Sequence, residues 1–331
     1  MKVSEQWLRE WVDPAVTSAG LAAQLTMAGL EVDSIEPVAP AFEKVVVGRV
    51  IGLTPHPDAD RLRVATVAVG GAEPLQIVCG APNVAIGMCV STALIGAVLP
   101  GGLNIKKSKL RGVESQGMLC SAKELGLAES SDGLLPLPPD SLPGMNIREL
   151  LQLDDALFEI ELTPNRGDCL GMEGVAREVA ALNRCEFRPL LVEAVASVVD
   201  ATFPVSLHDP ADCPRYVGRV IRGVNPAAET PLWMKERLRR AGVRSLGPLV
   251  DVTNYVMLEL GQPMHAFDLG RLHGGIEVRR ARPDDRLELL NGVIVTPDAE
   301  TLLITDQHGP LALAGIMGGE ISSCTDATRD V

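Results

Sequence analysis

Aromatic side chains are scarce in this sequence, which has five Phe, three Trp and two Tyr in 331 residues. The cores must therefore be built from Ala, Val, Leu and Ile, and a hydrophobic content of 46% is typical of a globular chain. No uncharged apolar run of about 18 residues occurs, so the sequence predicts no membrane span. The charged opening MKVSEQWLREWVDP is unlike a signal peptide. At this length we expect two or three domains.

Paired cysteines and familiar catalytic motifs are also missing. Seven cysteines occur singly, with no CxxC pair, which predicts reduced thiols in a cytoplasmic protein rather than a disulfide framework or a zinc site. The sequence lacks HExxH, GxSxG, Walker A and GxGxxG motifs, and none of its five histidines has a second histidine at metal-ligand spacing. We therefore expect no metal site within this chain, and any catalysis must rest on positioned water and dipoles.

Basic residues are outnumbered, with 30 Lys and Arg against 43 Asp and Glu, which argues against a protein that coats DNA. One local exception is the acid-free stretch 101–112, whose glycines suit a hairpin that could approach a phosphate backbone. Its cations are Lys106, Lys107, Lys109 and Arg111. A second basic cluster lies on or just past a predicted helix, at Lys235, Arg237, Arg239, Arg240 and Arg244. The alternative for both clusters is an ordinary solvated face.

The patterning predicts a small helical domain made of two separate parts, residues 1–39 and 151–190. Ser4 fits a helix N-cap, and a second helix fits residues 18–28. Trp7 and Trp11, one turn apart, are interpreted as core anchors, with a subunit interface as the alternative. Residues 40–150 between the two parts contain five or six short β-branched runs, which predict a small closed barrel inserted into the helical domain.

Residues 200–331 predict an α+β domain. Its one clear helix spans 230–243, with Thr230 as N-cap and Pro231 in the first turn. Its predicted strands are residues 204–209, 216–224, 275–282, 292–297 and 301–306.

Two stretches of this last region contain candidate catalytic or ligand-binding residues. In 250–269, we expect Glu259 and Asp268 to orient His265, although a lone histidine is often a satisfied core residue. In 311–323, a glycine pair follows an apolar strand. Glycine there would let the backbone approach a ligand or present N–H groups to an oxyanion, and a tight turn is the alternative.

An ordered series of segments resembles the N-terminal half of the beta subunit of bacterial phenylalanyl-tRNA synthetase, over essentially every residue. The segments include MKVSEQWLREWV, VVVGRVIGLTPHPDADRLRVATV, KLRGVESQGMLCS, FEIELTPNRGDCLGMEGVAREVAAL, VDVTNYVMLELGQPMHAFDL and LALAGIMGG. The barrel motif alone would be less specific, because it also occurs in free-standing tRNA-binding proteins and in synthetase appendages.

The resemblance implies a multidomain α+β chain: an OB-fold β-barrel of the tRNA-binding type, a flanking small helical domain, and an α+β editing domain. It implies a cytoplasmic heterotetramer of two alpha and two beta chains. The alpha subunit would carry ATP- and magnesium-dependent aminoacylation, with no cofactor in the part covered here. The beta subunit would help to place tRNA(Phe) and hydrolyse tyrosine wrongly attached to it.

The resemblance also implies residue roles in the editing pocket. Arg244 would contact the terminal adenosine or the ester, His265 would orient substrate or water, and Gly318 would form a wall without a side chain. Asn254, Gly315 and Gly319 would complete the pocket. No Ser or Cys nucleophile is implied, which fits attack by water.

The family continues for several hundred residues beyond Val331, so we expect the chain to be a fragment whose editing domain is incomplete. The carboxylate that reads the tyrosine hydroxyl would lie past this point. The alternative function is a non-catalytic tRNA-binding module that uses the 106–111 cations. A stand-alone hydrolase is weaker, because no nucleophile, metal or complete pocket is visible in the sequence.

Overall fold

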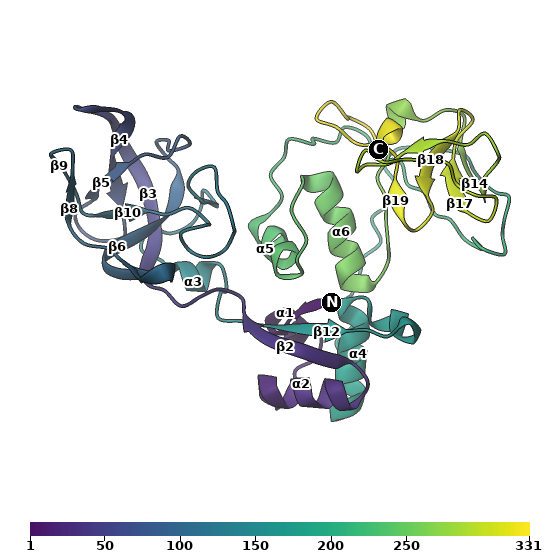
Figure 1. Cartoon of the computed structure of the whole chain (residues 1–331), viewed down its shortest axis with the longest axis horizontal. Helices are drawn as coiled ribbons and strands as arrows, with labels where there is room; N and C mark the ends of the chain where they lie inside the picture. Colours follow the sequence, from purple (N-terminus) through teal and green to yellow (C-terminus); the bar gives the residue numbers. More distant parts are fainter. The chain divides into compact units, whose positions relative to one another are not determined.

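The computed structural model describes all residues, 1–331, and divides them into two compact units. Unit 1 comprises Met1–Arg9 and Ala15–Glu161, and unit 2 comprises Glu10–Pro14 and Leu162–Val331. Figure 1 traces the elements of both units along the chain. None of the helices combines the length and the apolar character that a membrane crossing requires.

Unit 1 begins with a three-stranded antiparallel sheet of order β1-β12-β2. Its strands are β1 (Lys2–Ser4), β12 (Ala156–Glu161) and β2 (Glu31–Pro37), and the nearby helices are α1 (Glu5–Trp11), α2 (Ser18–Met27) and α3 (Ile147–Leu150). The Ser4 hydroxyl accepts a hydrogen bond from the Trp7 N–H at 3.3 Å, which confirms Ser4 as the cap of the first helix. Trp7 and Trp11 are each 4% exposed, as core anchors should be.

The expectation of a small helical domain in 1–39 and 151–190 is wrong at β1, β2 and β12. Phe158 and Ile160 are buried whereas Glu159 between them is half-buried, so β12 has the two-residue period of a strand. Pairing with β1 and β2 satisfies its backbone, and this long-range partner is invisible to a local pattern.

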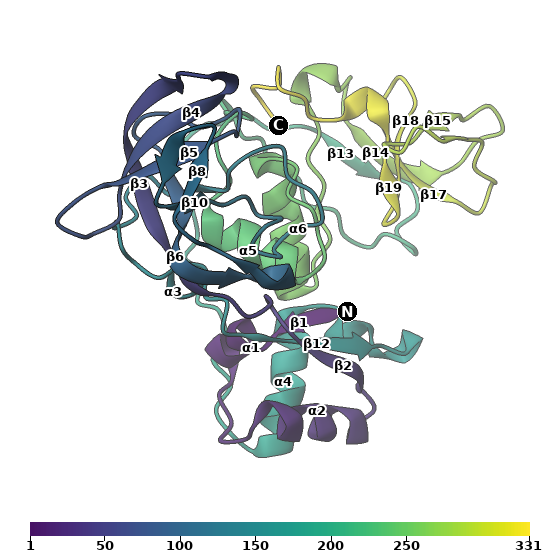
Figure 2. The same cartoon turned by 60° about the vertical axis from the view of Figure 1, so that its left-hand side comes forward.

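The second sheet of unit 1 has the order β10-β6-β3-β4-β5, with β7 and β11 also paired to β6. Its strands are β3 (Glu43–His56), β4 (Ala59–Ala68), β5 (Leu75–Cys79), β6 (Cys89–Leu99), β7 (Leu103–Asn104), β10 (Gly117–Leu119) and β11 (Pro136–Leu137). The sheet curls strongly (Figure 2), and the Gln116 N–H donates to the Gln76 carbonyl at 2.8 Å, so the segment before β10 meets β5. Val50, Ala65, Ile77 and Val90 are among the core residues inside this curl.

A separate hairpin carries the basic stretch. It consists of β8 (Ser108–Leu110) and β9 (Val113–Ser115), joined by Arg111 and Gly112, both with positive φ. A short 3-10 turn, η1 (Pro100–Gly102), precedes it. A hairpin is therefore present, but its bounds differ from the predicted 101–112: it begins after Lys106 and Lys107 and ends beyond Gly112, at Ser115.

Unit 2 contains a five-stranded sheet of order β13-β14-β17-β18-β19, a small β15–β16 ladder and three helices. The strands are β13 (Val205–Leu207), β14 (Ile276–Arg280), β15 (Leu287–Glu288), β16 (Ile294–Val295), β17 (Leu302–Thr305), β18 (Pro310–Leu313) and β19 (Met317–Gly318). The helices are α4 (Met172–Asn183), α5 (Leu232–Arg240) and α6 (Pro248–Leu260), with 3-10 turns η2 (Pro164–Cys169), η3 (Leu269–Arg271) and η4 (Glu320–Ser322). One core of this unit gathers Phe267, Ile276, Val278 and Leu311.

The start of α4 and the end of α6 approach through two glycines. Gly171 is the N-cap of α4, and Gly261 is the left-handed C-cap of α6, with φ +67°. A Cβ on Gly171 would lie 2.9 Å from the Gly261 Cα, closer than real Cβ atoms come to backbone.

Two local predictions in unit 2 are wrong. Residues 216–224 form no strand, and only Arg222 makes an isolated bridge, with Asp330. Thr230 does not cap α5, because its hydroxyl donates to the buried Asp251 carboxylate at 2.5 Å, and Pro231 occupies the cap position.

Candidate functional site

His265 and Gly318 lie against each other in unit 2. His265 is in the loop after α6, and Gly318 is the last residue of β19. A Cβ added to Gly318 would clash with Cε1 of the His265 ring and would lie 2.8 Å from Nε2. The Leu290 Cδ1 atom would be 3.2 Å from the same point. The imidazole therefore occupies space that is open only because residue 318 has no side chain.

The His265 ring keeps access to solvent, yet protein surrounds much of it. Phe267 packs edge-to-face on it, with ring centroids 4.6 Å apart and planes at 68°. Desolvation by these neighbours lowers the pKa of His265, because it disfavours the charged imidazolium. The ring is consequently neutral at pH 7 and has one nitrogen able to accept a hydrogen bond.

Neither Glu259 nor Asp268 bonds to the His265 ring, so the expectation that they orient it is wrong as a direct contact. Glu259 is buried on α6 and accepts the Tyr255 hydroxyl at 2.6 Å. Asp268 accepts the Gly270 N–H at 2.9 Å and the Thr328 hydroxyl at 2.7 Å. Both carboxylates are thus committed to other donors, and the direct neighbours of the His265 ring are Phe267 and Gly318.

The glycine-rich stretch forms a β-hairpin of β18 and β19. Gly315 lies between the strands with φ +72°, which is the conformation a tight turn requires of glycine. The Gly319 N–H donates to the Leu311 carbonyl at 2.7 Å, so this amide is already paired within the hairpin. The stretch is thus a tight turn at Gly315, and at Gly318 its backbone lies against the His265 ring, whereas approach to a ligand stays a prediction.

Arg244 lies in the loop between α5 and α6, is exposed, and forms no ion pair. The buried Asp251 carboxylate fixes this loop by accepting the Ser245 hydroxyl at 2.6 Å and the Leu246 N–H at 2.8 Å. Burial alone would raise the pKa of Asp251, but its hydrogen bonds outweigh burial and hold that pKa below its usual value. Asn254 is half-buried on α6. No recorded contact joins Arg244 or Asn254 to His265 or Gly318, so their place in a common pocket stays a prediction.

The second basic cluster is largely engaged within unit 2. Arg239 pairs with Glu236 at 2.8 Å, and Arg240 is only 5% exposed. Arg237 donates to the Tyr255 hydroxyl at 2.9 Å and pairs with Glu10. This pattern favours a structural role for the α5 cations.

The first basic cluster presents its charges to solvent. Lys106 and Lys109 are exposed and form no ion pair, whereas the Lys107 Nζ lies 2.8 Å from Glu114. Arg111 donates to the Asp58 carbonyl at 3.3 Å. Residues 106–114 thus carry four cations and one acid, with Lys106 and Lys107 just before the hairpin.

A buried histidine that the sequence patterns did not single out holds this hairpin. His56 is 5% exposed at the turn between β3 and β4. Its Nδ1 accepts the Asp58 N–H at 3.1 Å, so Nε2 carries the proton and donates to the Leu110 carbonyl at 3.0 Å. The sequence around His56 does not predict this contact, because the partner, the Leu110 carbonyl, belongs to a different hairpin.

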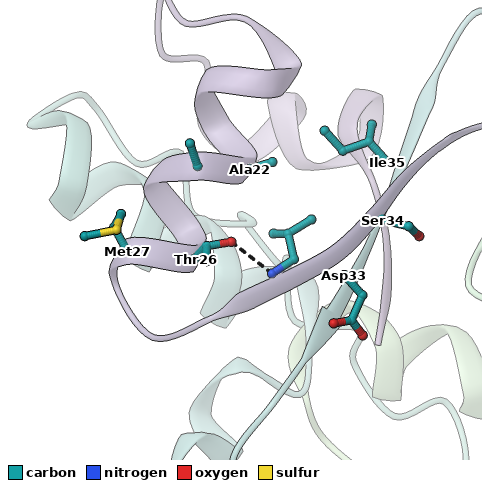
Figure 3. A pocket seen from close by; sticks show the side chains of 8 residues that line it. Ala22, Thr26, Met27, Asp33, Ser34 and Ile35 are labelled. Carbon is teal, nitrogen blue, oxygen red and sulfur yellow. Dashed lines mark hydrogen bonds between the residues drawn. The ribbon is translucent and has the colours of Figure 1, made fainter.

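Two open hollows, of about 420 and 480 Å³, are lined only by residues of unit 1. The first lies between α2 and β2, where Figure 3 shows Met27, Ile35 and Asp33 around it. The Thr26 hydroxyl there accepts the Val32 N–H at 3.0 Å. Neither hollow contains a residue that the sequence assigned to chemistry.

Comparison with known proteins finds one family model that matches part of each unit. The "B3/4 domain" family model matches residues 212–331, and the "Putative tRNA binding domain" model matches residues 45–146. The phenylalanine–tRNA ligase beta subunit of Methylococcus capsulatus is 59% identical over 331 residues, and that of Hahella chejuensis is 58% identical. Each match covers 100% of this chain and 42% of the relative, so the chain spans less than half the length of these proteins.

A solved N-terminal fragment of the phenylalanyl-tRNA synthetase beta subunit from Pyrococcus horikoshii is 17% identical, over 54% of each chain, with a TM-score of 0.29. That likeness is too low to bear on the fold. The sequence relatives confirm the resemblance inferred from the motifs, and all are subunits of an aminoacyl-tRNA synthetase. The chain belongs to the family of phenylalanine–tRNA ligase beta subunits, of which it matches an N-terminal portion that carries a tRNA-binding domain and a B3/4 domain.

Proposed function

We propose that this chain is the part of a phenylalanine–tRNA ligase beta subunit that binds tRNA(Phe) and hydrolyses tyrosine wrongly attached to it. The observation that supports editing most directly is the contact between the His265 ring and the bare backbone of Gly318, within the region matched by the B3/4 model. The curled sheet of unit 1 is proposed to be an OB-fold barrel, because its order β10-β6-β3-β4-β5 and the Gln76–Gln116 contact bring its edges together.

An editing step has a physical reason. Tyrosine is phenylalanine with one added hydroxyl, and a hydrophobic pocket rejects such an analogue only about a hundredfold. A second site that removes the wrong product raises the fidelity beyond that limit.

The proposed reaction uses water as the nucleophile. The water oxygen attacks the ester carbonyl of tyrosyl-tRNA, the bond to the ribose oxygen breaks, and the ribose hydroxyl recovers a proton, which leaves free tyrosine and tRNA. Neutral His265 orients the water or the ester by a hydrogen bond, and Gly318 leaves room for the substrate. Arg244 is proposed to contact the terminal adenosine, with Asn254, Gly315 and Gly319 around the pocket.

Magnesium and ATP are proposed for the complete enzyme, a cytoplasmic heterotetramer of two alpha and two beta subunits. Within this chain, no three His, Cys, Asp or Glu side chains gather in a way that could hold a metal ion. We therefore derive no step through magnesium or ATP here and assign aminoacylation to the alpha subunit.

The test is deacylation of Tyr-tRNA(Phe) by the complete beta subunit assembled with its alpha partner. Gly318→Trp should abolish deacylation and leave charging with phenylalanine intact. Gly167→Trp is the matched control, because nothing lies within 4 Å of a Cβ at the exposed Gly167. Deacylation that survives in Gly318→Trp would rule out the assignment.

The exposed cations of the β8–β9 hairpin support a second candidate, a tRNA-binding module without catalysis. It requires tRNA affinity but no deacylation. The same deacylation assay separates the two, because a pure binding module leaves Tyr-tRNA(Phe) intact in every variant.

A further inference from the structure

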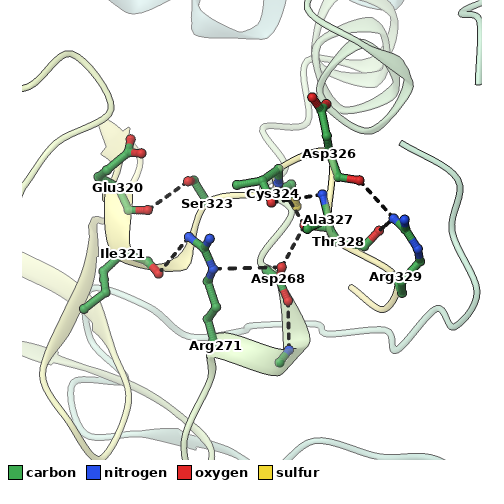
Figure 4. Close-up of polar contacts among 12 residues, drawn as sticks. Asp268, Arg271, Glu320, Ile321, Ser323, Cys324, Asp326, Ala327, Thr328 and Arg329 are labelled. Atoms are coloured by element: carbon green, nitrogen blue, oxygen red, sulfur yellow. Dashed lines mark hydrogen bonds and ion pairs between the residues drawn. The ribbon is translucent and has the colours of Figure 1, made fainter. Parts of the chain in front are cut away.

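Two segments of unit 2 are tied together by one carboxylate, that of Asp268 (Figure 4). Asp268 belongs to the loop that follows α6, and its Oδ2 accepts the hydroxyl of Thr328, near the end of the chain, at 2.7 Å. Its Oδ1 accepts the Gly270 N–H at 2.9 Å. Its own N–H donates to the Ser322 carbonyl at 3.0 Å. One residue thus joins the loop after α6 to the segment after β19.

The partners of Asp268 are themselves fixed. Thr328 is 1% exposed, and its hydroxyl oxygen also accepts the Thr325 N–H at 2.8 Å. The Cys324 thiol donates to the Ala266 carbonyl at 3.5 Å, and the Arg271 guanidinium donates to the Ile321 carbonyl at 3.4 Å. The Cys324 and Arg271 bonds run between the same two segments that Asp268 joins.

His265 and Gly318 lie at the adjoining ends of these segments. His265 precedes Asp268 by three residues, and Phe267 between them is buried with its ring against the imidazole. Gly318 directly precedes the segment that contains Ser322 and Thr328. The bonds of Asp268 therefore set the separation of the two backbones that meet at the His265–Gly318 contact, although Asp268 does not touch the imidazole.

We propose that Asp268, with Thr328 as its partner, is a positioning residue that holds the His265 ring against Gly318. The catalytic meaning of this inference rests on the proposed editing function, whereas the positional claim can be tested without it. Asp268 acts through the backbone on either side of the contact, and removal of its bond to Thr328 lets the two segments shift relative to each other, although the bonds of Ser322, Cys324 and Arg271 remain.

The test uses two substitutions of nearly equal size in the 331-residue chain. Thr328→Val keeps the shape of the side chain but removes the hydroxyl, and Thr328→Ser keeps the hydroxyl. Thr301→Val is the control, because the Thr301 hydroxyl makes the same kind of bond, to Asp298 at 3.0 Å, on a different turn. NMR of the histidine rings reports the chemical shifts and the titration midpoint of His265.

In Thr328→Val, we expect the His265 signals to move and the midpoint to rise toward that of a solvated histidine, because the ring loses its packing against Gly318. Thr328→Ser and Thr301→Val should leave both unchanged. A His265 that titrates identically in folded Thr328→Val and in the unsubstituted chain would overturn the proposal, as would an equal change in Thr301→Val.

Deacylation by the complete beta subunit with its alpha partner supplies the catalytic arm. Thr328→Val should lower kcat for Tyr-tRNA(Phe) by up to about a hundredfold, since misplacement of a group by an ångström can cost that much. Thr328→Ser should restore it. If Gly318→Trp leaves deacylation intact, the proposed function fails while the NMR result still decides the positional claim.

Discussion

No side chain fits on Gly318 while the ring of His265 keeps its place. The two residues come from different elements, a loop after a helix and the last strand of a sheet, and meet without any hydrogen bond between them. The contact is therefore one of shape, and it makes residue 318 sensitive to size rather than to polarity.

The neighbouring glycines should respond differently to alanine. At Gly318 the obstacle is a side-chain ring that can swing outward, so we expect Gly318→Ala to cost less than about 1 kcal/mol of unfolding free energy. At Gly319 the obstacle is the Leu311 carbonyl oxygen, 2.6 Å from the added Cβ, and Gly319→Ala should cost about 1–3 kcal/mol. Urea unfolding of both variants checks this, and equal costs would contradict the geometry.

The exposed hairpin lysines should carry salt-dependent tRNA affinity. Lys106→Glu combined with Lys109→Glu should weaken binding and reduce the slope of log affinity against log salt by roughly 0.7–0.9 for each lost phosphate contact. Reversal of all four cations, Lys107 and Arg111 included, should weaken binding further. Filter binding at several salt concentrations measures the slope. Lys123→Glu is the control, an exposed lysine elsewhere on the same unit, and an unchanged slope in the double variant would remove the hairpin from the tRNA interface.

Loss of the His56 bond should loosen the same hairpin. His56→Asn retains an acceptor for the Asp58 N–H but cannot reach the Leu110 carbonyl, so we expect a cost of about 1–2 kcal/mol. The amides of β8 and β9 should exchange hydrogen faster, which mass spectrometry of peptides detects. His208→Asn, at an exposed histidine, should change neither quantity. Unchanged exchange in His56→Asn would show that the hairpin needs no such bond.

Asp251 should make stability depend on pH in one direction. The folded state lowers the pKa of this carboxyl, so its ionised form stabilises the fold above the unfolded pKa of about 3.9. That contribution is lost as pH falls through the folded pKa. We expect Asp251→Asn to cost about 1–3 kcal/mol at pH 7 and progressively less below about pH 4. Urea unfolding at both pH values tests this against the exposed Asp284→Asn, and a cost independent of pH would contradict it.

Sequence patterns predicted correctly those features whose interactions are between residues close in the sequence. Ser4 caps the first helix and Gly112 lies in the turn of a hairpin, because in each case the partner lies within a few residues. Thr230 shows the limit: its sequence context predicts a cap, but a buried carboxylate 21 residues later takes its hydroxyl. The nearness of His265 to Gly318 came from the family resemblance, since no periodicity links a loop to a distant strand.

The direct contacts predicted between His265 and its charged neighbours are absent for the same reason. Glu259 lies one helical turn after Tyr255 and accepts a hydrogen bond from the Tyr255 hydroxyl. Asp268 accepts one from the Thr328 hydroxyl. The sequence places these carboxylates near His265 along the chain. It does not show which hydrogen-bond donors lie nearest to them in the folded structure.

The close approach of Gly171 and Gly261 disfavours a larger residue at either position, for two different reasons. At Gly171 the obstacle is crowding by the facing backbone, whereas at Gly261 it is the handedness of the chain, since a side chain there would meet only ordinary contacts. A change at one position therefore cannot relieve the other. A side chain at residue 171 therefore requires the two helix ends to move apart, whereas one at residue 261 requires only a residue that tolerates the left-handed conformation.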